Sequence, residues 1–288
     1  MKGKAIFLAL AAALCYSINI PLSKLLLENA GSCMTAGFLY LGAGISIGMM
    51  SLLKGKKKRA KLTRKDLPYT TGMVVLDIAA PVFLMLGLRG ASASLATLIN
   101  NFEIVATSLI AAVFFRERIT GRGWASIALI TLSTVVLSLS GSGDWRVSPP
   151  LLLVLLATVC WGLENNCTRM ISSKDTGEIV TIKGLFSGTG SIILALLTGE
   201  SFPGVKYIIL TLLLGSVAYG LSIFLYIKAQ NIIGAASTSS FYAVNPFLGS
   251  LLSFVILNEA ITQNYVIALI IMITGTSLMV RDTLSATG

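Results

Sequence analysis

Apolar residues fill most of the chain in runs of about twenty, separated by short polar stretches. A helix needs about 20 apolar residues to cross a bilayer, whereas a membrane β-strand needs about ten residues that alternate in polarity. The long runs therefore predict an all-α integral membrane protein with ten transmembrane helices. The expected spans are residues 5–27, 34–53, 69–88, 94–115, 123–140, 150–171, 178–198, 206–227, 233–256 and 264–281.

The composition agrees with a bilayer as the solvent. Of the 288 residues, 55% are apolar and 12% are charged, whereas a soluble domain carries about 25% charged residues. The first run follows Lys2 and Lys4, as in a signal peptide, but it continues to Leu27 and many further spans follow. We interpret it as an uncleaved first helix.

The net charge of +10 comes largely from one polar stretch between the second and third runs. Lys and Arg beside a span are retained on the cytoplasmic side and attract anionic lipid headgroups, so we prefer this interpretation to nucleic-acid binding. The basic residues of the stretch are Lys54, Lys56, Lys57, Lys58, Arg59, Lys61, Arg64 and Lys65.

The orientation follows from these charges. With the N-terminus inside, the stretch 54–65 and the basic residues of 116–122 lie inside too, and the opposite loops, 28–33, 89–93 and 141–148, hold few basic residues. The sequence therefore predicts a multi-pass protein of the cytoplasmic (inner) membrane with both termini in the cytoplasm.

Two parts of the chain repeat at nearly constant offsets. An offset of 142 aligns Glu117 with Glu259, and an offset of 145 aligns Cys15-Tyr16 with Cys160-Trp161. These matches place span 1 on span 6 and span 4 on span 9, which gives two five-helix repeats, residues 1–145 and 146–288. Because five is odd, the second repeat enters the bilayer from the opposite side, and such inverted repeats suit alternating access.

Several segments resemble the EamA-type members of the drug/metabolite transporter superfamily. They are residues 98–103 (LINNFE), 115–120 (FRERIT), 160–166 (CWGLENN), 183–185 (KGL), 245–246 (NP) and 257–262 (LNEAIT). The resemblance implies ten helices around a central cavity, helices 5 and 10 at the periphery or at a homodimer contact, and export or exchange of small metabolites. One departure is Glu103-Ile104 in the first half, where the second half has Asn245-Pro246.

Four ionisable residues, Asp77, Glu103, Glu164 and Lys183, fall well inside spans. Each costs about 2.5–3.5 kcal/mol at mid-bilayer on insertion scales, so it must face the bundle interior, a partner or water. We expect Glu164 and Lys183, on consecutive spans, to pair. Asp77 and Glu103 have no evident basic partner at their depth, so they are candidates for proton coupling or for binding an amino group.

Polar side chains recur on one face of equivalent spans. Thr97, Asn100, Glu103 and Thr107 share a face of span 4, and similar faces occur on spans 1, 6, 8 and 9. We expect the faces to converge on a substrate site, although such side chains also serve as interhelical hydrogen bonds. The expected substrate-binding residues are Asn19, Asn100, Glu103, Trp161, Glu164, Lys183, Tyr219, Tyr226, Tyr242 and Asn245.

Other local features predict details of packing. Pro21, Pro81 and Pro246 fall inside spans and should kink them. The GxxxG patterns 44–48 and 184–188 favour close helix approach. Glu117 and Glu259, at the ends of spans 4 and 9, are expected to have local partners in Arg116, Arg118 or the backbone.

The residue types argue against an enzyme. There is no histidine, the four cysteines lack metal-ligand spacing, and no segment resembles a nucleotide-binding loop. Paired carboxylates such as Asp77 and Glu103 are the only catalytic constellation left, and no cofactor or metal is expected.

The sequence favours a secondary transporter that moves a small polar metabolite by alternating access, with proton-coupled export as the preferred mode. Three acidic residues against one lysine in the spans favour a cationic or zwitterionic solute, such as an amino acid or an amine. The alternative is a facilitative channel or uniporter for a small solute, although channels usually carry repeated filters or charged rings that this chain lacks.

Overall fold

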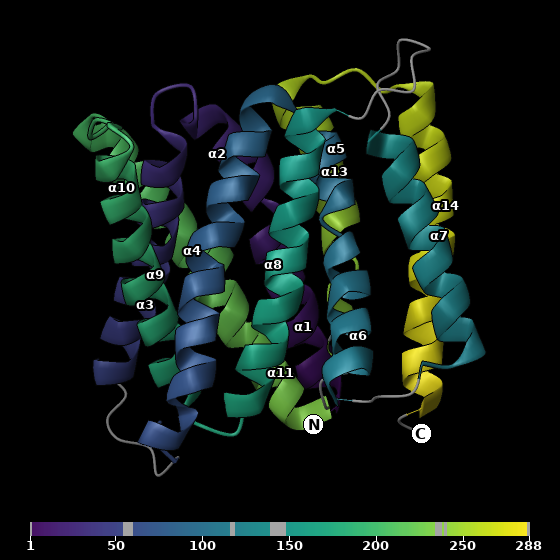
Figure 1. The fold of residues 1–288 in the computed structure, drawn as a ribbon, viewed down its shortest axis with the longest axis horizontal. Coiled ribbons are helices and arrows are strands. Elements are labelled where there is room, and N and C mark those ends of the chain that lie inside the picture. The colour runs from purple at the N-terminus through teal and green to yellow at the C-terminus, as the bar shows by residue number, and fades with distance from the viewer. Residues whose placement is uncertain are drawn as a thin grey trace.

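A computed structural model describes residues 2–53, 60–115, 119–138, 148–233, 238 and 241–286, and within these ranges the chain is helical without strands (Figure 1). Eight helical segments are long and apolar enough to cross a membrane, and two shorter apolar helices join them. The predicted all-α membrane fold with ten spans is confirmed.

The spans, in order, are α1 (Lys2–Ser17) with α2 (Asn19–Leu26), α3 (Ser32–Leu53), α4 (Leu67–Gly90) preceded by η1 (Arg64–Asp66), α5 (Ala93–Ile99) with α6 (Phe102–Phe115), α7 (Gly121–Ser138), α8 (Pro149–Ile171), α9 (Thr176–Leu197), α10 (Val205–Gly215) with the π-helical turn η2 (Ser216–Leu221) and α11 (Ser222–Ile233), α13 (Asn245–Leu257), and α14 (Gln263–Ala286).

The helix pairs follow a two-fold pattern. The main pairs are α3 with α9, α4 with α8, α1 with α11, α5 with α13 and α7 with α14. Exchanging each of the first five spans with its equivalent among the last five turns each pair into itself or into another pair. For example, α4 and α8 are spans 3 and 6, and the exchange turns them into spans 8 and 1, which is the pair of α11 with α1. The helix α1 starts at the end of the bundle where α8 finishes, so equivalent spans run in opposite directions (Figure 1). This is the arrangement of an inverted repeat.

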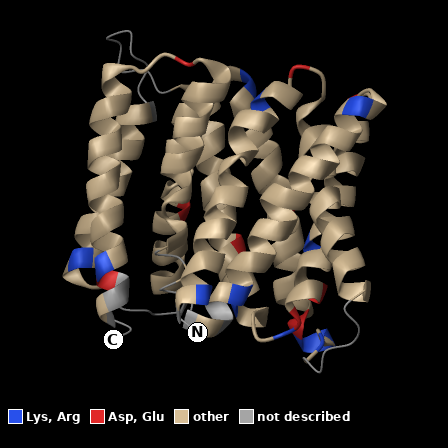
Figure 2. Cartoon of the chain, turned by 180° about the vertical axis from the view of Figure 1, so that it is seen from behind, with Lys and Arg blue, Asp and Glu red and all other residues tan. Residues whose placement is uncertain are grey.

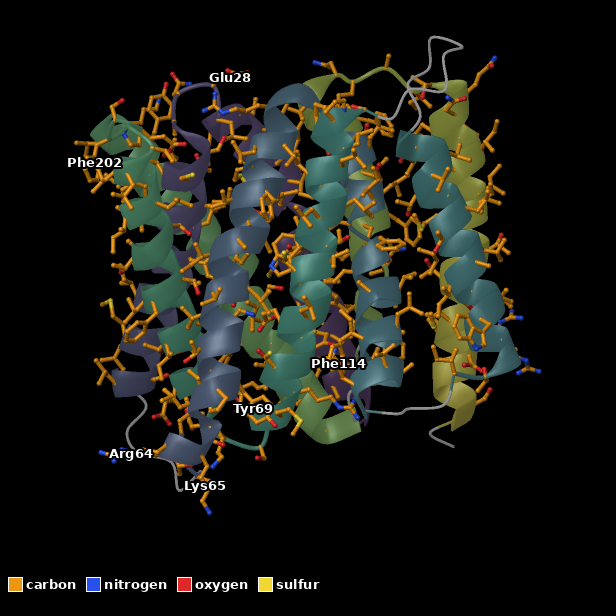
Figure 3. The ribbon with its side chains drawn as sticks, in the orientation of Figure 1. Glu28, Arg64, Lys65, Tyr69, Phe114 and Phe202 are labelled. Atoms are coloured by element: carbon orange, nitrogen blue, oxygen red, sulfur yellow. The ribbon has the colours of Figure 1, made fainter. Side chains whose placement is uncertain are left out.

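Both chain ends lie at the same end of the bundle, which we call the terminal end; the opposite end is the distal end (Figure 1). Lys and Arg gather mainly at the terminal end (Figure 2), where Arg64 and Lys65 are labelled in Figure 3. Lys54, Lys56, Lys57, Lys58 and Arg59 of the predicted basic stretch lie outside the described residues. The proposed repeat boundary at 145–146 also lies outside them.

Four spans are interrupted within the bundle. Span 1 breaks near Ile18 and span 9 turns at Ala243-Val244, just before Pro21 and Pro246 respectively, because a proline lacks the N–H that would bond the preceding turn. Span 8 contains the π-helical turn η2. Span 4 breaks at Asn100-Asn101 without a proline, whereas Pro81 sits inside the continuous helix α4. The breaks in spans 1 and 9 therefore lie where prolines were expected to kink the helices, whereas the break in span 4 and the π-helical turn in span 8 were not expected.

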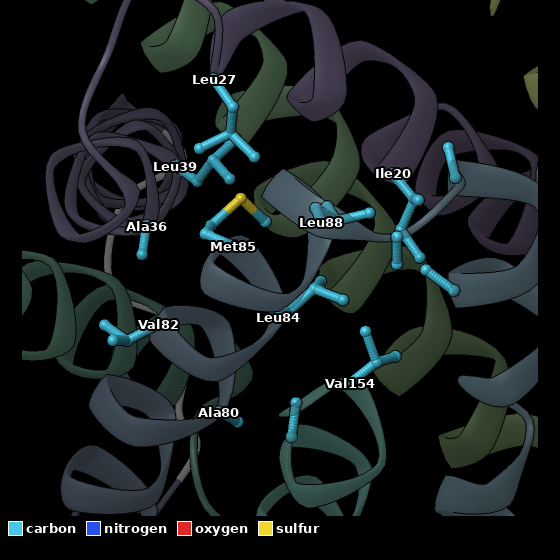
Figure 4. Packing of buried hydrophobic residues seen from close by; sticks show 14 of the residues in the cluster. Ile20, Leu27, Ala36, Leu39, Ala80, Val82, Leu84, Met85, Leu88 and Val154 are labelled. Carbon is cyan, nitrogen blue, oxygen red and sulfur yellow. The ribbon is translucent and has the colours of Figure 1, made fainter. Parts of the chain in front are cut away.

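The largest hydrophobic cluster lies among α2, α3, α4, α5 and α8, around residues such as Leu39, Leu84 and Val154 (Figure 4). Helix α3 approaches α9 closely because glycines face each other. A Cβ atom added to Gly184 would lie 2.3 Å from the backbone nitrogen of Gly44. The predicted close approach through the GxxxG patterns is confirmed, and it brings the neighbours of Gly184 against α3.

We expect Gly184→Ala to lower stability by about 1–3 kcal/mol, because the added methyl group overlaps the backbone of α3 and forces the two helices apart. Thermal unfolding in detergent measures the change. Gly3→Ala is the control, since a Cβ atom there meets nothing within 4 Å. Equal melting temperatures for the two variants would contradict the close α3–α9 contact.

Candidate functional site

A buried cluster of charges connects three helices at mid-depth. The Lys183 ammonium on α9 lies 3.1 Å from Asp77 Oδ2 on α4 and 2.9 Å from Glu164 Oε1 on α8. Asp77 is 0% exposed, Glu164 2% and Lys183 7%. We call these three residues the Lys183 cluster. The pairing of Lys183 with Glu164, expected from the sequence, is confirmed.

Asp77 differs from expectation. The sequence suggested that it has no basic partner at its depth, but Lys183 pairs with it, and the Tyr40 hydroxyl on α3 donates to its Oδ1 at 2.8 Å. Asp77 and Lys183 belong to spans 3 and 7, which are distant in sequence but packed together. Asp77 is therefore held by two neighbours, which makes it a less suitable proton carrier than a carboxyl without such partners.

Five tyrosines form a continuous row beside the Lys183 cluster, in the order Tyr226, Tyr242, Tyr16, Tyr219 and Tyr40. Successive ring centroids lie 5.0, 6.2, 5.5 and 4.9 Å apart. The row connects spans 8, 9, 1, 8 and 2, and its last member reaches Asp77. The structure thus brings together three expected residues, Tyr219, Tyr226 and Tyr242, with two that were not included, Tyr16 and Tyr40.

Glu103 forms a second polar group between the halves. The Asn165 side chain on α8 donates to Glu103 Oε1 at 2.6 Å and to Thr107 Oγ1 at 3.3 Å. All three side chains are partly exposed. No cation pairs with Glu103 among the described residues, which sets this carboxyl apart from Asp77 and Glu164.

The other expected residues occupy buried positions around these groups. Asn19 is buried and donates to the Tyr219 hydroxyl at 3.1 Å, while Ser23 donates to Asn19. Trp161 is buried in the hydrophobic core. Asn100 and Asn245 are buried at the breaks of spans 4 and 9, but the side chain of neither bonds to the other expected site residues within the described part of the chain.

The expected polar face of span 4 is not continuous. Because the helix breaks at Asn100-Asn101, Thr97 lies on α5, where its hydroxyl donates to the Ala93 carbonyl and its methyl group faces Gly249. Glu103 and Thr107 lie on α6 and share Asn165. The sequence could have indicated Asn165, since it follows Glu164 directly, and Tyr40, since it precedes Gly44 by one helical turn.

This arrangement supplies complementary chemistry for a solute with a positive charge. Negative charge exceeds positive charge in the cluster and at Glu103, and aromatic ring faces attract cations. The groups come from both halves of the chain. A positively charged group bound among them would contact both halves.

The sequence matches the model of the EamA-like transporter family twice, at residues 3–139 and 148–281. The chain belongs to the EamA-like transporter family. It is a membrane transporter rather than an enzyme, and its duplicated match agrees with the two-fold pattern of helix pairs.

Individual relatives of this EamA-like transporter are distant. An uncharacterized transporter of Methanothermobacter thermautotrophicus is 22% identical over 94% of this chain and 84% of its own length. An S-adenosylmethionine/S-adenosylhomocysteine transporter of Chlamydia trachomatis is 23% identical over 96% of this chain and 89% of its own length. One crystal structure shares the fold with a TM-score of 0.69 and 16% identity, covering 95% of this chain and 94% of that one.

We expect Lys183→Met to destabilise the protein by about 3–5 kcal/mol, because it leaves two carboxylates buried side by side without a cation. A variant that also carries Asp77→Asn and Glu164→Gln removes all three charges and should recover much of this loss. Denaturation in detergent measures both. The interpretation fails if the single variant is as stable as the wild type.

Proposed function

We propose that this EamA-like transporter moves a small metabolite bearing a positive charge, an amino acid or amine-like cation or zwitterion, by alternating access of its two inverted halves. The observation that supports this most directly is Glu103, a mid-depth carboxylate that no cation neutralises among the described residues. It is partly exposed and lies between α6 of the first half and α8 of the second.

S-adenosylmethionine is the first substrate to test. It carries a positively charged sulfonium and an amino acid group, and related transporters in Chlamydia are named for it and for S-adenosylhomocysteine. The positive group would bind Glu103, and the partly exposed rings of Tyr16, Tyr226 and Tyr242 would surround it. Contact between a cation and aromatic rings contributes about 0.5–2 kcal/mol.

Proton coupling, with export as its direction, belongs to the same proposal. No cation among the described residues neutralises Glu103, so its carboxylate can bind a proton when the solute has left and release it when a cationic solute arrives. Asp77, the other residue expected to couple protons, is engaged by Lys183 and Tyr40. We therefore place the coupling at Glu103.

The orientation and the surroundings complete the proposal. We place the terminal end, and with it both chain termini, on the cytoplasmic side of the cell membrane, with anionic lipid headgroups against Lys61, Arg64 and Lys65. The α7–α14 pair lies at one edge of the bundle, which is where a second copy would pack in a homodimer. Impermeant labelling of a cysteine placed at either terminus tests the orientation.

Glu103→Gln should abolish flux driven by a pH gradient in proteoliposomes while leaving the melting temperature nearly unchanged. The amide still accepts the hydrogen bond from Asn165, but it binds neither a proton nor a cation. Radiolabelled S-adenosylmethionine and a panel of amino acids and amines are the probes, chosen by the thermal stabilisation each one gives.

Glu28→Gln is the matched control, because Glu28 is exposed at the distal end and has no side-chain bond among the described residues (Figure 3). Wild-type flux in the Glu103→Gln variant would reject the coupling role. Saturable flux that ignores the pH gradient in the wild type would indicate a uniporter instead.

A further inference from the structure

The carboxylate that ends span 9 reaches across to the other half of the protein. Glu259 Oε1 accepts the backbone N–H of Ala93 at 2.6 Å, and Oε2 accepts that of Ser94 at 2.9 Å. Glu259 therefore bonds to backbone, as expected, but the partner is not local because it lies in the first half of the chain. Arg116, Glu117 and Arg118 lie outside the described residues. We call this two-fold contact the Glu259 clamp.

A second carboxylate makes the same kind of contact at the same end of the bundle. Glu200, after α9, accepts the backbone N–H groups of Cys33 at 3.0 Å and Met34 at 2.8 Å at the start of α3. Each clamp therefore connects a distal loop of the second half to a helix of the first half. Such charge-assisted bonds to helix N-termini are the stronger kind of hydrogen bond.

The backbone is shaped to aim both carboxylates. Gly199, with φ of 77°, precedes Glu200, and Asn258, with φ of 50°, precedes Glu259. These left-handed residues end α9 and α13 and turn the following residue back over the bundle. A left-handed conformation is uncommon outside glycine and asparagine, so the repetition of this device at both positions indicates a built contact.

The Glu259 clamp holds a short element that has a break at its other end. Helix α5 has seven residues, begins at the clamp and ends at the Asn100-Asn101 break, beyond which α6 carries Glu103. The side-chain oxygens of Asn100 and Asn101 have no hydrogen-bond partner in the described structure. Helix α5 is therefore held at one end by the second half. At its other end a turn connects it to α6, where the Glu103 N–H donates to the Asn100 carbonyl at 3.1 Å and the Asn101 side chain donates to Thr276 at 2.8 Å.

The geometry points to Glu259 and Glu200 as positioning residues that control opening at the distal end. Their bonds hold the two halves together there. When these bonds break, α5 moves away from the second half and the site opens at the distal end. Other charged residues at this end bond elsewhere, although Lys24 also attracts the Glu259 carboxylate electrostatically. Lys24 donates to the carbonyls of Leu88 and Ala91, and Arg89 to the Ala30 carbonyl and Ser32. These four contacts stay within the first half.

The test measures the distal opening directly, by electron paramagnetic resonance between spin labels at Asn29 and Ile261, two exposed positions at that end. Glu259→Gln puts an amide NH₂ against a backbone N–H and removes the charge. We expect the population with the longer distance to rise by about tenfold, the factor for losing one charge-assisted bond. Labels at Lys61 and Arg122, at the terminal end, should not report the same increase.

Three further variants separate the clamp from charge and from folding. Glu28→Gln removes a charge at the same end without breaking a bond and should change nothing. Asn258→Val disfavours the left-handed conformation and should act like Glu259→Gln, whereas Asn258→Gly should not. If Glu259→Gln does not yield folded protein, the same distance measurement on Glu200→Gln tests the proposal.

Equal distance distributions in Glu259→Gln and Glu28→Gln would overturn the proposal. It would also be overturned if Glu259→Gln lowered the melting temperature without increasing the population at the longer distance. The inference rests on the alternating-access cycle proposed above, but its measurement needs no substrate. Failure of transport with S-adenosylmethionine therefore leaves this test intact.

Discussion

A bilayer does not tolerate an isolated charge at mid-depth, and the Lys183 cluster is how this protein meets that constraint. The Lys183 ammonium pairs with two carboxylates on different helices, so the relative positions of α4, α8 and α9 are fixed along the bundle. The glycine contact between α3 and α9 brings Tyr40 within reach of Asp77, which adds a fourth helix. Because α4 belongs to the first half and α8 and α9 to the second, the cluster also joins the halves.

With two of the three mid-depth carboxylates engaged by lysine, Glu103 is left to bind a mobile partner. It lies on span 4, one of the four interrupted spans, and the row of tyrosines connects the other three, spans 1, 8 and 9. Interrupted helices in a membrane are tolerated where they line a protein interior, and they occur in transporters at the site where halves move against each other. In the proposed cycle the paired charges stay fixed, and Glu103 and the interrupted spans are the parts that change.

The sequence predicted the spans well because hydropathy reports each residue's solvent. It predicted Lys183 with Glu164 from their positions on consecutive spans, although α8 and α9 come together by packing against α4 rather than against each other. It did not predict that Asp77 contacts Lys183, since that requires knowing that spans 3 and 7 pack together. The break at Asn100-Asn101 and the π-helical turn in span 8 contain no proline and were not predicted, whereas Pro21 and Pro246 pointed to the breaks in spans 1 and 9. The Glu259 contact depends on a left-handed Asn258, which no periodicity reveals.

Alternating access requires the surroundings of Glu103 to open to one side of the membrane at a time. Thr107 shares Asn165 with Glu103 and is partly exposed, so a Thr107→Cys variant without the four native cysteines reports on this site. In oriented proteoliposomes, a charged thiol reagent should react from either side, and a condition that speeds reaction from one side should slow it from the other. Fast reaction from both sides under the same condition, or from one side under all conditions, would contradict alternating access.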